Sequence, residues 1–187
     1  SFSLSIIAVD EGIDTGDILK ELTFPIGITD TIVDLHRIAN EYFPKMLVEV
    51  LEDITAGTLS RMKQVASAGN YYPLRFPDDG IVVWDMNTSA QVHNKIRALT
   101  VPYPCAFTFN KGRKIKLISS NLESYGFRGE PGTVYRTGPE GLLVCASDKC
   151  LWITEAVYED NGESVFREIN RYEAFSTVRR YILGEGP

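Results

Sequence analysis

The chain has 187 residues, of which 44% are hydrophobic and 24% are charged, with a formal net charge of −6. This length allows one ordinary domain or two small ones, and the composition is unlike that of disordered, collagen-like or disulfide-rich proteins. No apolar run approaches the roughly 18 residues that a membrane span needs. The opening stretch SFSLSIIAVDEG also lacks the basic region of a signal peptide.

The charge is unevenly placed along the chain. Residues 1–69 hold five basic and eleven acidic side chains, whereas residues 70–187 hold fourteen of each. Neither part has the excess of positive charge that is typical of a dedicated nucleic-acid-binding protein. The one local basic patch, KGRKIK at Lys111–Lys116, is typical of a solvated hairpin tip.

The first part of the chain predicts a strand, a turn, a second strand and a helix. Apolar, β-branched runs at 2–9 and 17–26 predict the two strands. Asp30 is the predicted N-cap of the helix, Gly57 its C-terminal cap, and Pro44 predicts a kink or two abutting helices. The helix is indicated by apolar residues that recur every three or four positions: Ile32, Leu35, Ala39, Tyr42, Met46, Val50 and Ile54.

The second part predicts mainly β structure. Residues 58–77 are polar with little periodicity and predict a linker, and residues 88–99 predict a short helix capped by Asn87 or Thr88. Five short strands separated by hairpin turns follow, namely CAFTF, KIKLISS, GTVYRT, LLVCAS and LWITEAVY. This pattern favours a small closed or half-closed barrel of the OB type. The tail at 164–187 predicts a short helix or an added strand packed outside.

Two strands and one helix cannot bury a core of their own. Either this piece docks entirely on the second part of the chain, or residues 1–57 are an α/β remnant, the C-terminal part of a larger α/β domain. We favour the remnant, and the family resemblance given below implies that the larger domain is Rossmann-like. A linker at 58–77 then leads to an OB-like β-barrel domain at 78–187.

The cysteine content predicts reduced thiols. Cys105, Cys145 and Cys150 are an odd set, which disfavours a disulfide framework. Cys145 and Cys150 flank the turn ASDK, where a disulfide or a metal pair is the alternative. With histidine only at 36 and 93, no metal site is expected. We interpret the chain as reduced and cytoplasmic.

The acidic stretch DEGIDTGD, between the first two strands, is the strongest candidate for a functional site. Its glycines suit a sharp turn or a close approach to a ligand, and carboxylates at strand ends suit ligand binding in open α/β sheets. Calcium is disfavoured, because the spacing lacks the ligands of an EF-hand and strands flank the loop. A plain acidic hairpin without chemistry is the other alternative.

The turn resembles the D-x-G-x-D-T-G-D-I-L segment of the formyltransferases that use 10-formyltetrahydrofolate. FPDDGIVVW at 76–84 is similar to the family's R-x-P-E-D-G-x-I-D-W, and NKIRALTVPYPCAFTF at 94–109 is similar to N-x-I-R-A-x-x-P-x-P-G-A-F-T. The three motifs cover most of residues 1–120, and the β texture beyond suits the family's C-terminal domain. Cys105 replaces the usual Gly, and Val83 a common acidic residue.

The resemblance implies which residues act. Asp14 would be catalytic, holding and polarising a histidine or managing protons around the tetrahedral intermediate. Thr15 and Gly16 would shape the turn, and the backbone from Asp10 to Gly12 would border the pteridine pocket. The family's N-x-H-x-S-x-L-P segment, which supplies an Asn and a His, has no match in this chain. The resemblance therefore implies a fragment that is inactive alone and that takes 10-formyltetrahydrofolate as formyl donor without a metal.

The acceptor and the rival functions stay open. We expect a small amine such as an amino-sugar nucleotide, because binding initiator tRNA calls for a basic face; the alternative is a methionyl-tRNA formyltransferase. A second alternative is a non-catalytic OB-type binding module that stacks bases on Phe107, Phe109, Tyr135 or Trp152, although such residues are more often core. In a third reading, the second domain is a structural unit that forms a homodimer.

Overall fold

The computed structural model describes residues 1–65, 69 and 72–182. The chain divides into two compact units, Ser1–Leu74 and Arg75–Pro187. Among the described residues, none of the helices is both long and apolar enough to cross a membrane.

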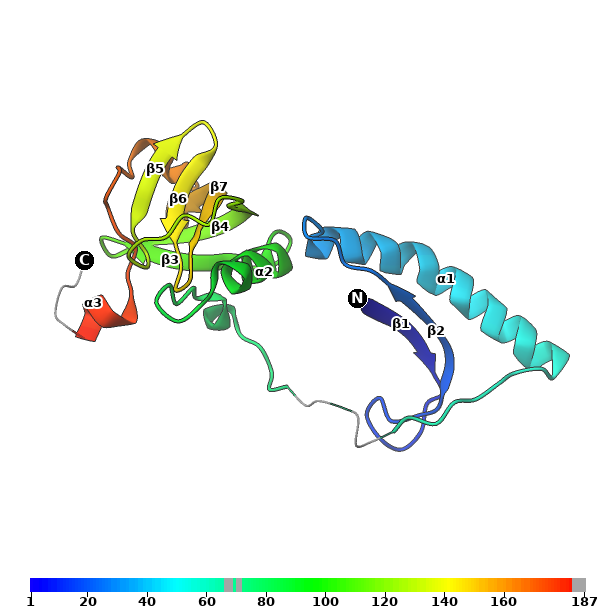
Figure 1. Cartoon of the computed structure of the whole chain (residues 1–187). Coiled ribbons are helices and arrows are strands. Elements are labelled where there is room, and N and C mark those ends of the chain that lie inside the picture. The colour runs from blue at the N-terminus through cyan, green and yellow to red at the C-terminus, as the bar shows by residue number, and fades with distance from the viewer. Residues whose placement is uncertain (66–68, 70–71, 183–187) are drawn as a thin grey trace. The chain divides into compact units, whose positions relative to one another are not determined.

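The first unit is one antiparallel strand pair covered by one long helix (Figure 1). β1 (Phe2–Ile7) pairs with β2 (Ile18–Phe24), and α1 (Ile32–Ala56) packs along them. Met46 and Val50 of the predicted stripe are buried, whereas Ile54 is exposed. The predicted strands and helix are thus confirmed, although the outer end of the stripe stays in solvent.

Two details of α1 differ from the prediction. The N-cap is Thr31 and not Asp30, because the Asp34 carboxylate accepts hydrogen bonds from the Thr31 backbone N–H and hydroxyl, both at 2.9 Å. Asp30 instead accepts from the backbone N–H of Gly27 at 2.6 Å. The helix also continues through Pro44 as one element, so of the two predicted forms the pair of abutting helices is wrong. Gly57 ends it in a left-handed conformation, with φ 72°, as predicted.

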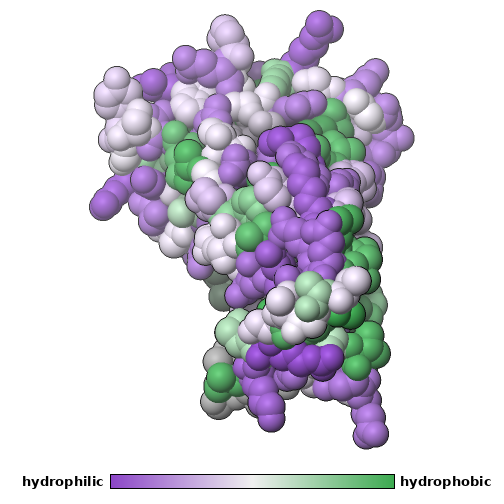
Figure 2. Space-filling view, turned by 90° about the vertical axis from the view of Figure 1, so that its right-hand side faces the viewer, coloured by the Kyte–Doolittle hydropathy of each residue, from purple (hydrophilic) through white to green (hydrophobic). Residues whose placement is uncertain are grey.

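Part of α1 keeps apolar side chains at the surface. These exposed residues are Val33, Phe43, Leu47, Val48, Leu51 and Ile54. Figure 2 shows hydrophobic and hydrophilic residues interspersed over the face of the protein that is turned toward the viewer. Since α1 buries only part of its apolar surface, its two-stranded sheet does not provide a complete core for it.

The second unit begins with a short 3-10 turn, η2 (Pro77–Gly80), and α2 (Ser89–Leu99). Thr88 caps α2, as the sequence allows, by accepting a hydrogen bond from the Gln91 backbone N–H at 3.2 Å. The start of α2 is also held by Asp148, whose carboxylate accepts from the Ser89 N–H at 2.7 Å. The helix is therefore tied to the hairpin turn that carries Asp148.

The five predicted strands form one antiparallel sheet with the order β3-β4-β7-β6-β5 (Figure 1). Their bounds are β3 (Ala106–Asn110), β4 (Arg113–Leu122), β5 (Val134–Gly138), β6 (Gly141–Cys145) and β7 (Cys150–Tyr158). Among the described residues, the edge strands β3 and β5 do not pair with each other. The predicted β texture is confirmed, but the sheet is open and does not close into a barrel by strand pairing.

The main core lies on one face of this sheet, beneath α2. It includes Trp84, Val92, Ile96, Leu117, Leu142, Ile153 and Phe175. The tail forms η3 (Val165–Arg167) and α3 (Val178–Ile182), and Phe175 between them is fully buried. The tail is thus partly core, whereas the sequence predicted it to pack outside.

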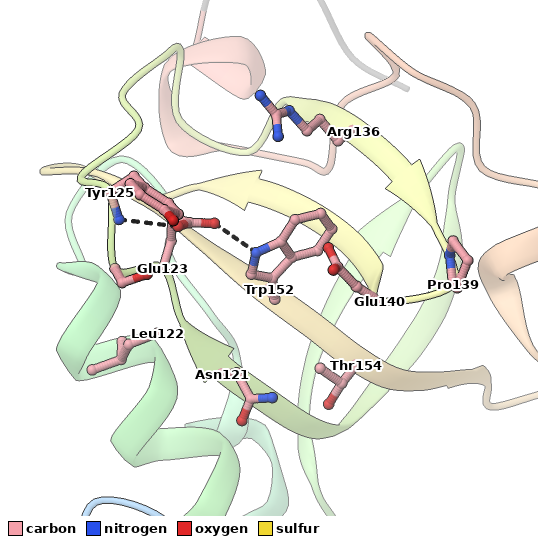
Figure 3. A pocket seen from close by; sticks show the side chains of 10 residues that line it. Asn121, Leu122, Glu123, Tyr125, Arg136, Pro139, Glu140, Trp152 and Thr154 are labelled. Carbon is pink, nitrogen blue, oxygen red and sulfur yellow. Dashed lines mark hydrogen bonds between the residues drawn. The ribbon is translucent and has the colours of Figure 1, made fainter.

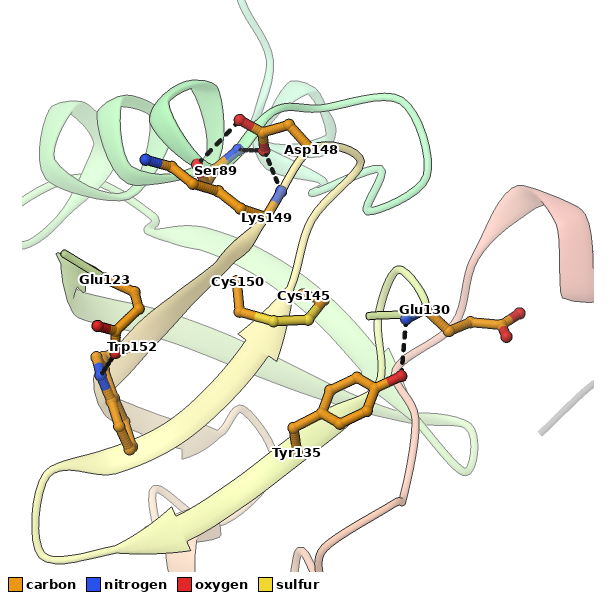
Figure 4. Close-up of a disulfide and its surroundings, with 9 residues drawn as sticks. All are labelled: Ser89, Glu123, Glu130, Tyr135, Cys145, Asp148, Lys149, Cys150 and Trp152. Atoms are coloured by element: carbon orange, nitrogen blue, oxygen red, sulfur yellow. Dashed lines mark hydrogen bonds between the residues drawn. A yellow bond between two sulfur atoms is a disulfide. The ribbon is translucent and has the colours of Figure 1, made fainter. Parts of the chain in front are cut away.

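The other face of the sheet carries a smaller apolar cluster with a disulfide (Figure 4). The β6–β7 hairpin pairs Cys145 with Cys150 in register, and the two sulfurs are bonded. The expectation of reduced thiols is wrong for this pair, because residues directly opposite each other in an antiparallel pair bring their side chains together on one face. Cys105 is a free, buried thiol.

Candidate functional site

The acidic turn between β1 and β2 is organised around the carboxylate of Asp10. Its Oδ1 accepts hydrogen bonds from the Thr15 hydroxyl at 2.6 Å and the Gly12 N–H at 3.0 Å. The bond from Thr15 and then the one from Gly12 lower the pKa of Asp10 below its ordinary value of 3.8. The turn therefore keeps one carboxylate ionised for a structural purpose.

Gly16 is required where the turn meets the strands. A Cβ at this position would overlap the carbonyl oxygen of Ala8, whose N–H donates to Asp17 O at 2.9 Å. A Cβ on Gly12 would overlap the hydroxyl of Thr15. The two glycines thus allow close approaches within the turn itself, and no ligand is needed to explain them.

Asp14 stands apart from the Asp10 network. Its φ is 56°, a left-handed conformation that Asp tolerates better than most residues, and its side chain is exposed. Gln64 holds this part of the turn, because its Nε2 donates to Asp14 O at 2.8 Å and to Gly16 O at 2.7 Å. The structure therefore presents the Asp14 carboxylate to solvent on a fixed backbone.

The structure thus brings the predicted residues Asp10, Gly12, Asp14, Thr15 and Gly16 into one turn. Sequence reasoning missed Gln64, which lies in the predicted linker. Gln64 bonds to residues about fifty positions away, so the sequence around it gives no sign of this contact.

Neither histidine lies in this turn. His36 lies exposed on α1. His93 on α2 is buried in the second unit, where its Nδ1 lies 2.9 Å from the Ser120 hydroxyl oxygen. Within the described part of the chain, no group of three His, Cys, Asp or Glu side chains is close enough to hold a metal ion.

The second unit has a pocket of about 620 Å³ built from the two later motifs. Its walls are mostly apolar and include Phe76, Pro77, Leu99 and Pro104. A pocket with apolar walls and a few polar groups is the usual form of a small-molecule site.

The polar groups of this pocket favour an anion. Lys95 donates from Nζ to Ile81 O at 2.6 Å and to Asp79 O at 3.2 Å. Burial lowers the pKa of Lys95, and the positive charge of Arg75 lowers it further. Among the residues that line the pocket, two are cationic, Arg75 and Lys95, and one is a carboxylate, Asp79. Asp79 caps η2, because its carboxylate accepts a hydrogen bond from the Phe76 N–H at 2.8 Å.

Cys105 lines the same pocket at the position where the resembled motif has Gly. Its φ is 69°, which explains why Gly suits this position. Burial raises the pKa of its thiol, so that the group stays protonated.

The basic patch at Lys111–Lys116 is neutralised by carboxylates. Lys111 pairs with Glu173 at 3.0 Å, and Lys114 and Lys116 share Glu159 at 3.1 and 3.5 Å. Arg113 binds both Asp160 and Glu168 and stacks on Tyr158. This patch therefore offers little positive field to a nucleic acid.

Of the aromatic residues that suit base stacking, Phe107 is buried. Tyr135 and Trp152 are half-buried against the disulfide cluster.

Comparison with known proteins identifies the class of fold. Residues 76–169 match the family described as "Formyl transferase, C-terminal domain". The HypX protein of Aquifex aeolicus, solved in complex with tetrahydrofolic acid, superposes with a TM-score of 0.62 over 97% of this chain and 29% of its own, at 21% identity. The chain belongs to the formyltransferase family.

Two further members of the family are similar to this chain. The methionyl-tRNA formyltransferase of Geobacter sulfurreducens is 36% identical over 149 residues, which are 79% of this chain and 46% of that protein. An N-formyltransferase of Helicobacter canadensis, solved with folinic acid and dTDP-3-aminofucose, is 25% identical with a TM-score of 0.63, over 80% of this chain and 53% of its own. The chain spans about half the length of the curated relatives it matches.

Proposed function

We propose that this chain forms part of an enzyme that transfers a formyl group from 10-formyltetrahydrofolate to an amine. The observation that carries the proposal is the exposed carboxylate of Asp14, held on a left-handed backbone by Gln64, in a chain of this family. The amine nitrogen forms a bond to the formyl carbon, the bond from that carbon to N10 of the folate breaks, and the amine proton passes to tetrahydrofolate.

In this proposal Asp14 handles protons around the tetrahedral intermediate. An Asn and a His, for which the sequence has no matching segment, act from outside this chain. The backbone from Asp10 to Gly12 borders the pteridine, and the Asp10–Thr15 bond keeps the turn in shape for it. A preorganised turn of this kind needs no reorganisation during the reaction.

The comparisons favour methionyl-tRNA as the acceptor over the amino-sugar nucleotide that the sequence alone suggested. The curated relatives at 30–36% identity are methionyl-tRNA formyltransferases. We assign the pocket of Arg75 and Lys95 to a phosphate of the acceptor, because two cations there face one carboxylate.

An amino-sugar nucleotide is the second candidate, on two observations. The basic patch at Lys111–Lys116 is paired with carboxylates, which weakens a tRNA surface. The Helicobacter canadensis relative was solved with a nucleotide-linked amino sugar. Such a ligand also carries phosphate groups for Arg75 and Lys95.

The test is an assay of tetrahydrofolate release by this chain joined to an upstream segment that bears the Asn and His. Methionyl-tRNA and a panel of amino-sugar nucleotides serve as acceptors. Asp14→Asn should lower turnover about 10²- to 10⁴-fold without unfolding, because Asn tolerates the same left-handed backbone. Glu21→Gln, an exposed carboxylate on β2, is the matched control and should keep full activity.

A normal rate for Asp14→Asn would show that this carboxylate is not catalytic. Salt-dependent binding of an oligonucleotide, with no folate-linked turnover, would support the non-catalytic binding module instead. A homodimer through the second unit and a cytoplasmic location stay predictions, which sedimentation and localisation of the whole protein can check.

A further inference from the structure

A groove of about 670 Å³ lies on the face of the sheet opposite the main core (Figure 3). The indole of Trp152 on β7 lies at its centre. The side chains around it come from the end of β4, the β4–β5 connection, β5, the β5–β6 turn and β7. Those with polar groups are Asn121, Glu123, Ser124, Tyr125, Arg136, Glu140 and Thr154.

The indole of Trp152 is held in place from two directions. Its Nε1 donates to Glu123 Oε2 at 2.6 Å, and Glu123 Oε1 accepts from the Tyr125 N–H at 3.0 Å. The bond from Tyr125, followed by that from Trp152, lowers the pKa of Glu123 against the effect of burial. The ring also packs against the cluster of Leu143 and the disulfide. Trp152 is therefore a rigid, half-exposed aromatic platform.

The groups around the platform suit a neutral hydroxylated ligand. Glu140 at the β5–β6 turn offers an exposed carboxylate, Arg136 a guanidinium that also stacks near the Phe127 ring, and Asn121 an amide. Two carboxylates, Glu123 and Glu140, outnumber Arg136 in the groove, so a phosphate chain is repelled. The charge thus disfavours an oligonucleotide on Trp152, although the aromatic surface alone would allow one.

We infer that this groove binds a saccharide ring, stacked by its C–H face on Trp152 and hydrogen-bonded through its hydroxyls to Glu140, Arg136 and Asn121. The face of an aromatic ring carries negative charge density and attracts the weakly positive C–H groups of a sugar. Sugar hydroxyls both donate and accept, so they satisfy a carboxylate, a guanidinium and an amide at once. The inference does not depend on formyl transfer.

The two tryptophans provide a direct test on the 187-residue chain. The indole N–H signals of Trp152 and Trp84 are followed by NMR during titration with methyl glycosides of glucose, galactose, fucose and N-acetylglucosamine. Trp84 is fully buried, with Nε1 donating to the Thr108 hydroxyl, and serves as an internal reference. At least one glycoside should shift the Trp152 signal saturably, with a Kd on the order of 1–10 mM for a ligand of this size.

Two variants check the site. Glu140→Ala, at an exposed turn, should weaken the best glycoside about tenfold. Trp152→Ala removes the reporting indole, so binding is followed there by saturation-transfer NMR on the glycoside's own signals and should be abolished, with the Trp84 signal showing that the fold is kept. Glu155→Ala, an exposed carboxylate on β7 outside the groove, should leave binding unchanged.

Two results would overturn the inference. One is a Trp152 signal that no glycoside moves at about 100 mM, well above the expected Kd. The other is a signal that adenosine or tetramethylammonium moves at lower concentration than any glycoside, which would identify a nucleobase or cation site.

Discussion

The indole of Trp84 stacks on the ring of Phe175, with centroids 5.5 Å apart and planes inclined by 22°. The segment around Phe175 also reaches both edges of the open sheet. Its backbone bonds to Gly132 and Val134 at the β5 edge and to Phe109 of β3, with N···O distances of 2.7–2.9 Å. The C-terminal tail, rather than a direct pairing of β3 with β5, therefore covers the gap between these two edge strands.

Phe175→Ala should destabilise the second unit by about 3–5 kcal/mol, because it removes a fully buried aromatic ring from the core. Urea unfolding followed by tryptophan fluorescence measures the change. Tyr181→Ala, a ring in α3 that is 83% exposed, is the control and should stay within about 0.5 kcal/mol of the parent. A loss within about 0.5 kcal/mol for Phe175→Ala would mean that this part of the tail is not core.

The sequence was sufficient for the elements whose signal is local. The strands of the sheet and α2 follow from apolar alternation, hairpin turns and a capping residue, which are decided within about ten residues. Of the predicted closed or half-closed barrel, the closed form is wrong. The gap between β3 and β5 is covered by the tail, in which Phe175 contacts Trp84 far away in sequence. The sequence of the tail shows that Phe175 is an apolar residue. It does not show against which part of the sheet the ring packs.

The candidate site was predicted in part for the same reason. The residues of the acidic turn are contiguous, so their motif could be found. Arg75 and Lys95 were not predicted, although they lie next to and within the two later motifs, because only the folded chain brings them to one pocket. Gln64 was missed because only the folded chain brings it to the turn. The neutralised charge of Lys111–Lys116 depends on acidic residues from the strand end and tail, which net charge alone does not reveal.

Gly16→Ala should destabilise the β1–β2 pair by about 2–3 kcal/mol, since the new Cβ forces the Ala8 carbonyl to move. Hydrogen exchange of the Ala8 N–H, which donates to Asp17 O, reports the loss directly. Gly57→Ala is the matched control. Gly57 has a φ of 72° but open space for a Cβ, so the substitution should lower the stability by only about 1 kcal/mol. Faster exchange in the Gly57 variant than in the Gly16 variant would contradict the prediction.

Thr15→Val should raise the pKa of Asp10 toward 3.8, because the Thr15 hydroxyl is the largest cause of its lowering. The folded pKa lies below the unfolded one, so the stabilisation is complete above about pH 4 and is lost as the pH falls through the folded pKa. Carboxylate ¹³C NMR between about pH 2 and 6 measures the titration. Thr23→Val, which removes a hydroxyl bonded to Ser3 and not to Asp10, should leave the Asp10 pKa unchanged.

Arg75→Gln should raise the pKa of Lys95 without restoring it to 10.5, because burial is the larger cause of the lowering and stays in place. The unfolded chain binds more protons at Lys95, so stability should rise with pH between the lowered folded pKa and 10.5, and this rise should shrink in the variant. The ¹³Cε signal of Lys95 between about pH 8 and 12 follows the titration. Arg128→Gln, an exposed cation outside the pocket, is the control and should have no effect.

The same titration tests the anion site assigned to this pocket. Inorganic phosphate beside Lys95 favours its charged form, so saturating phosphate should raise the Lys95 pKa in the parent chain. The rise should be smaller in the Arg75→Gln variant, because a weaker cation pair binds phosphate less well. If phosphate leaves the Lys95 pKa unchanged while Arg75→Gln moves it, the two cations interact but do not form an anion site, and the acceptor phosphate must bind elsewhere.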